Sequence, residues 1–137
     1  MTALTEDDLR ESTLMQTMGF VRLSPGKPGP QRISMEFEAK QEQCHSGNIV
    51  QGGFVTGWID SAMAHVLMRA TNFEKLPLSL DIKIAFLRAA NPGIVVAEAW
   101  IELLGNRTAF VEGLLRTPSG DVIAKGMSTV MLKALKR

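Results

Sequence analysis

The chain has 137 residues, of which 45% are hydrophobic and 21% charged, so we expect one globular domain with a buried core over residues 1–137. A net charge of +1 creates no field that attracts nucleic acid or an anionic membrane, and no apolar run reaches the ~20 residues that cross a bilayer. The N-terminal stretch lacks the basic start and apolar run of a signal peptide, and Cys44 is the only cysteine, which predicts a cytoplasmic protein without disulfides.

The N-terminal part is predicted to begin with a short amphipathic helix over residues 5–17. Thr5 suits its N-cap, acidic residues occupy its first turn, and Gly19 ends it. After it we expect a short strand, a turn-rich connector, a strand whose alternating pattern indicates one buried face, and a polar loop: residues 20–24, 25–30, 32–38 and 39–51.

A long apolar helix is predicted over residues 52–70. Its side chains are apolar on nearly every side, and a helix of that kind is buried all round. One carboxylate, Asp60, interrupts it, and burying a carboxylate without a partner costs several kcal/mol. Gly52 and Gly53 stand where the first backbone N–H groups of the helix lack an acceptor within the helix. Because such a helix start can bind an anion or a developing oxyanion, we expect an active site here.

Four extended segments follow, over residues 76–87, 93–104, 108–117 and 122–133. Sequences rich in Gly, Pro and Asn separate them, and short turns between the last three predict an antiparallel meander. The expected fold class is therefore α+β: one long central helix wrapped by an antiparallel β-sheet and preceded by a short N-terminal helix.

Gly52 and Asp60 are too far apart on one helix to act on the same atom. Eight residues separate them by ~12 Å along the axis, whereas a carboxylate must come within roughly 3 Å of its target. An antiparallel copy of the helix places Asp60 of one chain beside Gly52 of the other. Small residues recur on one face, at Gly53, Gly57, Asp60 and Ala64, which permits close approach. We therefore predict a homodimer with two composite sites, the alternative being that this stripe packs against the chain's own sheet.

The histidines and the cysteine do not suggest a metal site. Cys44, His45 and His65 are too few and too poorly spaced to bind zinc. A nucleophilic Cys–His pair joins distant segments, whereas Cys44 directly precedes His45. His65 is expected to be a packed or hydrogen-bonded helix residue. We therefore expect no metal and no redox cofactor.

This order of elements and the start of the central helix resemble the hotdog fold, and more narrowly the acyl-CoA thioesterases of the phenylacetate-pathway type. That family shows an N-x-x-G-x-x-H-G-G loop, with an acid nine residues after the His. Here the loop runs from His45 to Gly53 as HSGNIVQGG, and Asp60 stands nine residues after Gln51. The resemblance covers residues 18–133.

The loop departs from the family pattern at three positions. Gln51 replaces the usual His, His45 stands in the place of an Asn or Gln, and Asn48 in that of a common Gly. A role that needs an imidazole at position 51 therefore does not carry over directly. Either His45 takes over the orientation of water or thioester, or the pocket fits a different acyl group.

The resemblance implies hydrolysis of an acyl-CoA thioester, with coenzyme A as part of the substrate and not as a cofactor. The Gly52 N–H would polarise the carbonyl, and Asp60 of the partner chain would act as general base or as nucleophile. Gln51 and His45 would assist at the catalytic centre. Ser79, at a strand start that also resembles the family's, would hydrogen-bond Asp60 or the attacking water. The implied substrate-binding residues are Gly53, Asn48, Ser79, Phe54, Trp58 and Met63.

Other parts of the resemblance concern partners. Arginines near strand ends are candidates to bind the phosphates of coenzyme A: Arg88, Arg107 and Arg116. The implied assembly is a homo-oligomer, a dimer or a dimer of dimers, with neither nucleic acid nor membrane as partner. Two alternatives stay open, a hydratase or dehydratase of the same fold and a non-catalytic acyl-CoA-binding protein. A binding protein keeps its ligand when Asp60 is replaced, whereas an esterase loses turnover.

Overall fold

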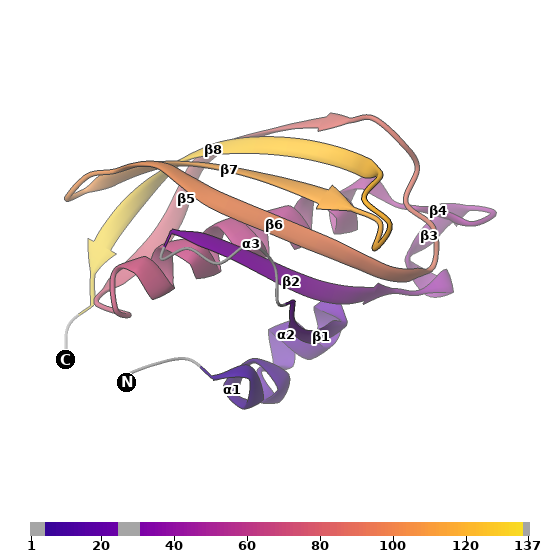
Figure 1. Ribbon diagram of the computed structural model, residues 1–137, viewed down its shortest axis with the longest axis horizontal. Coiled ribbons are helices and arrows are strands. Elements are labelled where there is room, and N and C mark those ends of the chain that lie inside the picture. The colour runs from indigo at the N-terminus through magenta and orange to yellow at the C-terminus, as the bar shows by residue number, and fades with distance from the viewer. Residues whose placement is uncertain (1–4, 25–30, 136–137) are drawn as a thin grey trace.

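The computed structural model describes residues 5–24 and 31–135. Six strands form one antiparallel sheet in the order β1-β2-β6-β7-β8-β5, and this sheet arches over the long helix α3 (Figure 1). The helices are α1 (Glu6–Glu11), α2 (Thr13–Met18) and α3 (Gly52–Ala70), with a 3-10 turn at Gln41–Gln43. The strands are β1 (Phe20–Leu23), β2 (Arg32–Ala39), β3 (Cys44–Ser46), β4 (Ile49–Val50), β5 (Lys75–Phe86), β6 (Gly93–Leu104), β7 (Thr108–Arg116) and β8 (Val122–Ala134).

The N-terminal segment forms two short helices. The prediction of one continuous helix over residues 5–17 was therefore wrong at Ser12, which separates them. Thr5 forms the predicted N-cap, a capping box with Asp8. At Ser12 the backbone is extended, with φ −67° and ψ 126°, and the Ser12 hydroxyl accepts a hydrogen bond from the Met15 N–H to start α2. A serine that caps a new helix competes with continuation of the old one, and here the cap prevails.

The strand β2 is buried on both faces, which corrects the expectation of one buried face over 32–38. Ser34 and Glu36, which alternate with the apolar residues, are only 7% and 8% exposed. Glu36 is paired with Arg22 of the neighbouring strand β1 at 3.1 Å, and this pairing permits burial of the carboxylate. The polar loop over 39–51 contains the 3-10 turn and the β3–β4 hairpin, and the connector expected over 25–30 lies outside the described residues.

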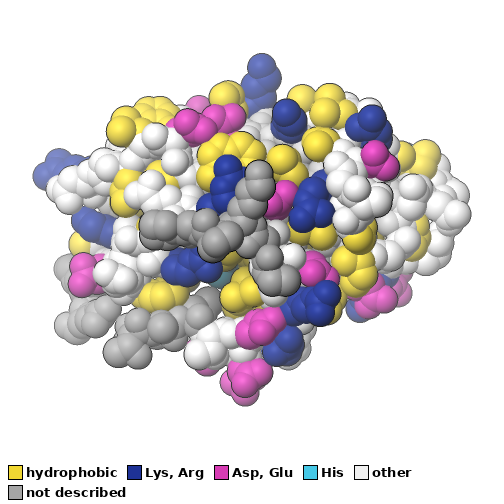
Figure 2. Space-filling model, in the orientation of Figure 1, with side chains coloured by type: hydrophobic (Ala, Val, Ile, Leu, Met, Phe, Trp, Pro, Cys, Tyr) yellow, Lys and Arg dark blue, Asp and Glu magenta, His cyan; other side chains and the backbone are white. Residues whose placement is uncertain are grey.

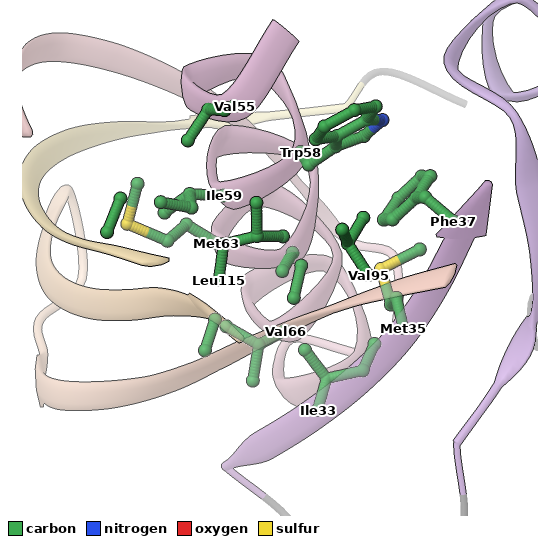
Figure 3. Close-up of a cluster of buried hydrophobic side chains, with 14 of the residues drawn as sticks. Ile33, Met35, Phe37, Val55, Trp58, Ile59, Met63, Val66, Val95 and Leu115 are labelled. Carbon is green, nitrogen blue, oxygen red and sulfur yellow. The ribbon is translucent and has the colours of Figure 1, made fainter. Parts of the chain in front are cut away.

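The helix α3 has the predicted bounds but is buried mainly on one side. Its sheet-facing side chains form the centre of the hydrophobic core (Figure 3): Val55, Trp58, Ile59, Ala62, Met63, Val66 and Leu67. The stripe of small residues lies on the other side, where Gly53 is exposed and Asp60 and Ala64 are half-buried. Part of the stripe nevertheless packs within the chain, since Asp60 contacts Ser79 of β5 and Gly57 lies against the side chain of Met18. One sheet covers one side of a helix, so an apolar helix need not be buried all round.

Two neighbours determine how α3 is seated. Gly113 and Gly126 are paired across β7 and β8, and a Cβ atom at either position would lie 3.0 or 3.3 Å from the Ile59 Cγ2 atom. These glycines let the middle of the helix approach the sheet closely. The second neighbour is α2, whose Met18 carbonyl accepts a hydrogen bond from the Trp58 indole N–H at 2.7 Å. The short N-terminal helices thus hold α3 against the sheet and leave Asp60 accessible.

The strand β5 is a long edge strand with exposed apolar side chains. It lies beside β8 alone, which leaves one row of its backbone groups without strand partners in the described sheet. Its exposed large hydrophobic residues are Leu76, Leu78, Leu80, Ile82 and Phe86. An exposed, long and apolar edge is a template for pairing with another chain.

The surface shows no large field of one charge on the face in Figure 2, where Lys and Arg side chains are interspersed with Asp and Glu. Among the described residues, no helix combines the length and the apolar character needed to cross a membrane.

Candidate active site

The start of α3 presents a backbone donor without an acceptor. Gln51 is the N-cap, with φ −63° and ψ 137°, and its side-chain Oε1 accepts the Gly53 N–H at 2.9 Å. The Gly52 N–H has no hydrogen-bond acceptor in the described part of the chain. The positive end of the helix therefore points one free donor outwards. Gln51 thus caps the helix start through its side-chain oxygen and keeps its NH2 group as a further donor.

The carboxylate of Asp60 is oriented by a hydrogen bond on one side. The Ser79 Oγ donates to the Asp60 Oδ1 at 3.2 Å, which is one of the two interactions predicted for Ser79. Ser79 lies on β5, next to an irregularity in the pairing with β8 between Ser79 and Asp81. No described Lys or Arg forms a salt bridge with Asp60. The second oxygen, Oδ2, is therefore free to accept a proton or to meet a reacting atom.

A hollow of about 400 Å³ lies beside the start of α3. Its lining is mainly apolar and comes from β3, β4, the start of α3, the end of β5 and the segment that follows β5: His45, Ile49, Val50, Gly52, Val55, Phe86, Leu87, Arg88, Ala89 and Ala90. It brings together Gly52 and His45, two of the predicted catalytic residues. Asp60 is not among the lining residues, so within one chain the donor and the carboxylate face different places.

The residues Phe86 and Leu87 were missed by the sequence analysis as parts of the site. They lie at the end of β5, 34 residues after Gly52 in the case of Phe86, and only the fold brings them to the helix start. The Phe86 Cε1 and Cζ atoms are 3.2 Å from the position that a Cβ atom on Gly52 would take. The sequence holds one weak signal, a pair of large apolar residues at the very end of a strand.

Trp58 and Met63 do not line an open pocket, which corrects their predicted role in substrate binding. They are 0% and 1% exposed and lie in the core between α3 and the sheet (Figure 3). Phe54 is half-buried, with its ring centroid 6.3 Å from that of Trp58. Asn48 is exposed in the β3–β4 turn, where its backbone carbonyl accepts a hydrogen bond from the Asn91 Nδ2 at 2.8 Å.

The two histidines differ in environment. His45 is exposed, and its Nδ1 is 2.8 Å from the Ser46 Oγ. His65 is half-buried, and its Nδ1 donates to the Ser61 carbonyl at 2.7 Å. Burial lowers the pKa of His65 because it disfavours the charged imidazolium, while the bond to Ser61 opposes that shift. His65 is thus the hydrogen-bonded helix residue that the sequence predicted.

One of the three predicted arginines lies at the hollow. Arg88 lines it, and its Nη1 donates to the Val122 carbonyl at 2.8 Å. Arg116 is instead paired with Glu98 at 2.7 Å, and Arg107 is exposed outside the lining. Within residues 5–24 and 31–135, no group of three or more His, Cys, Asp or Glu side chains is arranged to hold a metal ion.

The family model of the thioesterase superfamily matches residues 47–124, which include the start of α3, Asp60 and Ser79. The chain therefore belongs to the thioesterase superfamily, whose reaction is hydrolysis of a thioester bond. Its α+β architecture, a long helix against one antiparallel sheet, is the hotdog fold. No curated protein sequence matches the chain.

Solved structures share this fold along almost the whole chain. A thioesterase from Haemophilus influenzae has a TM-score of 0.85 and 17% identity, with 98% of this chain and 94% of that one covered. A phenylacetic acid degradation-related protein from Ralstonia eutropha has a TM-score of 0.80 and 22% identity, with 90% and 95% covered. A conserved protein from Pseudomonas aeruginosa has a TM-score of 0.79 and 22% identity, with 93% and 99% covered. At these identities the likeness shows the fold alone.

Proposed function

We propose that this protein hydrolyses an acyl-CoA thioester to the free acid and coenzyme A, at two composite sites of a homodimer. The observation that carries the proposal is the separation of two half-sites in one chain. One half-site is the Gly52 N–H without a partner beside an apolar hollow, and the other is the Asp60 carboxylate held by Ser79. Acyl transfer needs both groups: a donor that stabilises the developing oxyanion and a carboxylate that acts as base or nucleophile.

The edge strand supports a dimer in which these half-sites meet. Gly52 lies against Phe86 near one end of β5, whereas Asp60 binds Ser79 nearer the other end. In an antiparallel pair of β5 strands, a two-fold axis between residues 82 and 83 sets Phe86 of one chain opposite Ser79 of the other. The same operation brings Gly52 of one chain toward Asp60 of its partner. The strand pairing and the helix spacing therefore favour the same arrangement.

The reaction then follows from these groups. The thioester carbonyl oxygen accepts the Gly52 N–H, which stabilises the charge that develops there. Asp60 of the partner takes a proton from water as the water oxygen bonds to the carbonyl carbon. The tetrahedral intermediate collapses, the C–S bond breaks, and the proton passes to the departing thiolate. Direct attack by the Asp60 carboxylate breaks the C–S bond, releases the coenzyme A thiolate and gives a mixed anhydride, which water then hydrolyses to the free acid and Asp60; this route uses the same geometry.

Three side chains assist in this scheme: His45 and Arg88, which line the hollow, and Gln51, the N-cap of α3. The Gln51 NH2 group and the exposed imidazole of His45 orient the thioester or the water at the helix start. Arg88 uses the donors that Val122 does not occupy to bind a phosphate of coenzyme A.

The direct test is thiol release from a panel of short-, medium- and long-chain and aryl acyl-CoAs. We expect turnover of at least one of them without added metal. Tight binding of acyl-CoA without turnover would contradict a hydrolase and indicate a non-catalytic binding protein. Hydration of an enoyl-CoA, with no thiol release, would indicate a hydratase.

The dimer is tested by placing a charge on the edge strand. Leu80 of β5 is 63% exposed, and Leu103 of β6 is 60% exposed, which makes Leu103 a matched control. We expect Leu80→Lys to give monomers in light scattering after size-exclusion chromatography and to lose hydrolysis, because each lysine places an unpaired charge in the apolar contact between the two β5 strands. Leu103→Lys should remain a dimer with full activity. An active, monomeric Leu80→Lys protein would contradict the composite site.

A further inference from the structure

An exposed aromatic ring lies against the first residue of α3. The Phe86 Cε1 and Cζ atoms are both 3.2 Å from the position of a Cβ atom on Gly52, yet Phe86 is 56% exposed. Full burial of such a side chain contributes roughly 1.5–3 kcal/mol. This ring remains at the surface, beside the hollow and beside a backbone donor without a partner. This exposed fraction is that of a single chain, and the proposed dimer covers part of the ring, but the contact with Gly52 places the ring beside the carbonyl of a bound thioester in either case.

The backbone that carries Phe86 is fixed by the neighbouring strand. The N–H groups of Leu87 and Arg88 both donate to the Ile123 carbonyl, at 2.8 and 3.0 Å. The Arg88 Nη1 also donates to the Val122 carbonyl at 2.8 Å. On the other side of the segment, the Val50 N–H donates to the Ala90 carbonyl at 2.9 Å. The wall that Phe86 forms is therefore built before a ligand arrives.

The rest of the lining favours an uncharged acyl group. Ile49, Val50 and Val55 contribute aliphatic surface, and no carboxylate from residues 5–24 or 31–135 of the same chain lines the hollow. The two polar side chains, His45 and Arg88, suit the polar parts of a thioester and of coenzyme A. An acyl chain without charge is thus the part of the substrate that fits beside Phe86.

We propose that Phe86 selects the acyl group by its shape next to the carbonyl, an inference that rests on the proposed function. A carbonyl oxygen at ~2.9 Å from the Gly52 nitrogen places the adjoining carbon of the acyl group within van der Waals reach of the ring. The ring face admits a straight chain or a flat aryl group at that carbon. A second alkyl branch there collides with the ring.

The test compares two ligands of equal carbon number that differ only in branching. In S-(2-oxopentyl)-CoA and S-(3-methyl-2-oxobutyl)-CoA a methylene stands between sulfur and carbonyl, so neither is hydrolysed. By calorimetry the native protein should bind the straight ligand at least ~10-fold more tightly, the size of effect that one misplaced methyl has in a fitted pocket. Phe86→Ala and Phe86→Leu should both reduce this ratio, Ala to less than ~3-fold. Phe110→Ala, an exposed Phe outside the lining, should keep it.

The outcomes separate this inference from the proposed function. Equal ratios in native, Phe86→Ala and Phe86→Leu proteins overturn the role of Phe86, and so does a native protein that binds neither ligand or both equally. Hydrolysis is measured separately with butyryl-CoA and isobutyryl-CoA. Absence of hydrolysis with these two substrates and with the whole acyl-CoA panel overturns the hydrolase, while a binding ratio that depends on Phe86 still supports the acyl subsite.

Discussion

Replacing Asp60 by Asn is expected to lower kcat/KM for acyl-CoA hydrolysis by ~100-fold or more, a loss of about 2.7 kcal/mol in transition-state stabilisation. The amide has nearly the same shape and can still accept the hydrogen bond from the Ser79 Oγ, so the fold should persist. It cannot take a proton from water or attack a carbonyl as an anion. The measurement is thiol release by both proteins across the acyl-CoA panel, with thermal unfolding followed by circular dichroism.

A matched control is Asp121→Asn in the turn between β7 and β8. Asp121 is exposed and bonds Thr117 through its backbone alone: its N–H donates to the Thr117 Oγ1, and its carbonyl accepts the Thr117 N–H. The same change of charge at that position should leave turnover unaltered. If Asp60→Asn kept native turnover, the carboxylate would be a structural group, and the chemistry would have to come from His45 or from solvent.

The sequence predicts the helix that carries this carboxylate well, because its signals are local. Gly52–Ala70 has the predicted bounds, with the polar N-cap Gln51 before it and a long apolar run within it. Asp60 and the glycines could be singled out for the same reason, since their types and spacing are visible in one segment. The turns between the last strands are equally local.

What the sequence could not show is which side of α3 faces the sheet. Trp58 and Met63 look like pocket residues on a helix that is apolar on nearly every side, and no periodicity separates them from Phe54. The sheet determines which side is buried, because the absence of side chains at Gly113 and Gly126 lets the Ile59 side of α3 approach β7 and β8 closely. Burial of the aromatic and thioether side chains follows from that seating.

The site also depends on contacts between distant segments. Phe86 reaches Gly52 because β5 runs back along α3, and Glu36 is buried because β1 brings Arg22 beside it. Neither contact has a signature in residue spacing. The interruption at Ser12 has a local cause. There the preference of Ser for an N-cap competes with continuation of the first helix, and the two differ little in free energy.

Replacing Gly52 by Pro should reduce hydrolysis by ~10²–10³-fold, the typical cost of losing one oxyanion donor. Pro deletes the backbone N–H and is well tolerated as the first residue of a helix. The extended backbone at Gln51, with φ −63° and ψ 137°, suits a residue before proline. The missing N–H itself costs no hydrogen bond, because it has no acceptor in the described part of the chain. Gly52→Ala is the control for the Cβ atom that Pro also adds 3.2 Å from the Phe86 ring: it keeps the donor and should lose much less turnover than Gly52→Pro.

Mixed dimers of Gly52→Pro and Asp60→Asn chains then show whether donor and carboxylate act across the interface. In such a dimer one site pairs the intact Gly52 of one chain with the intact Asp60 of the other, while the second site lacks both. About half of the native activity should therefore return in purified heterodimers, although each parent is nearly inactive. If each site lay within one chain, both chains would be defective and no activity would return. Recovery in the heterodimer thus requires that the 12 residues of β5, or another two-fold contact, hold two incomplete half-sites together.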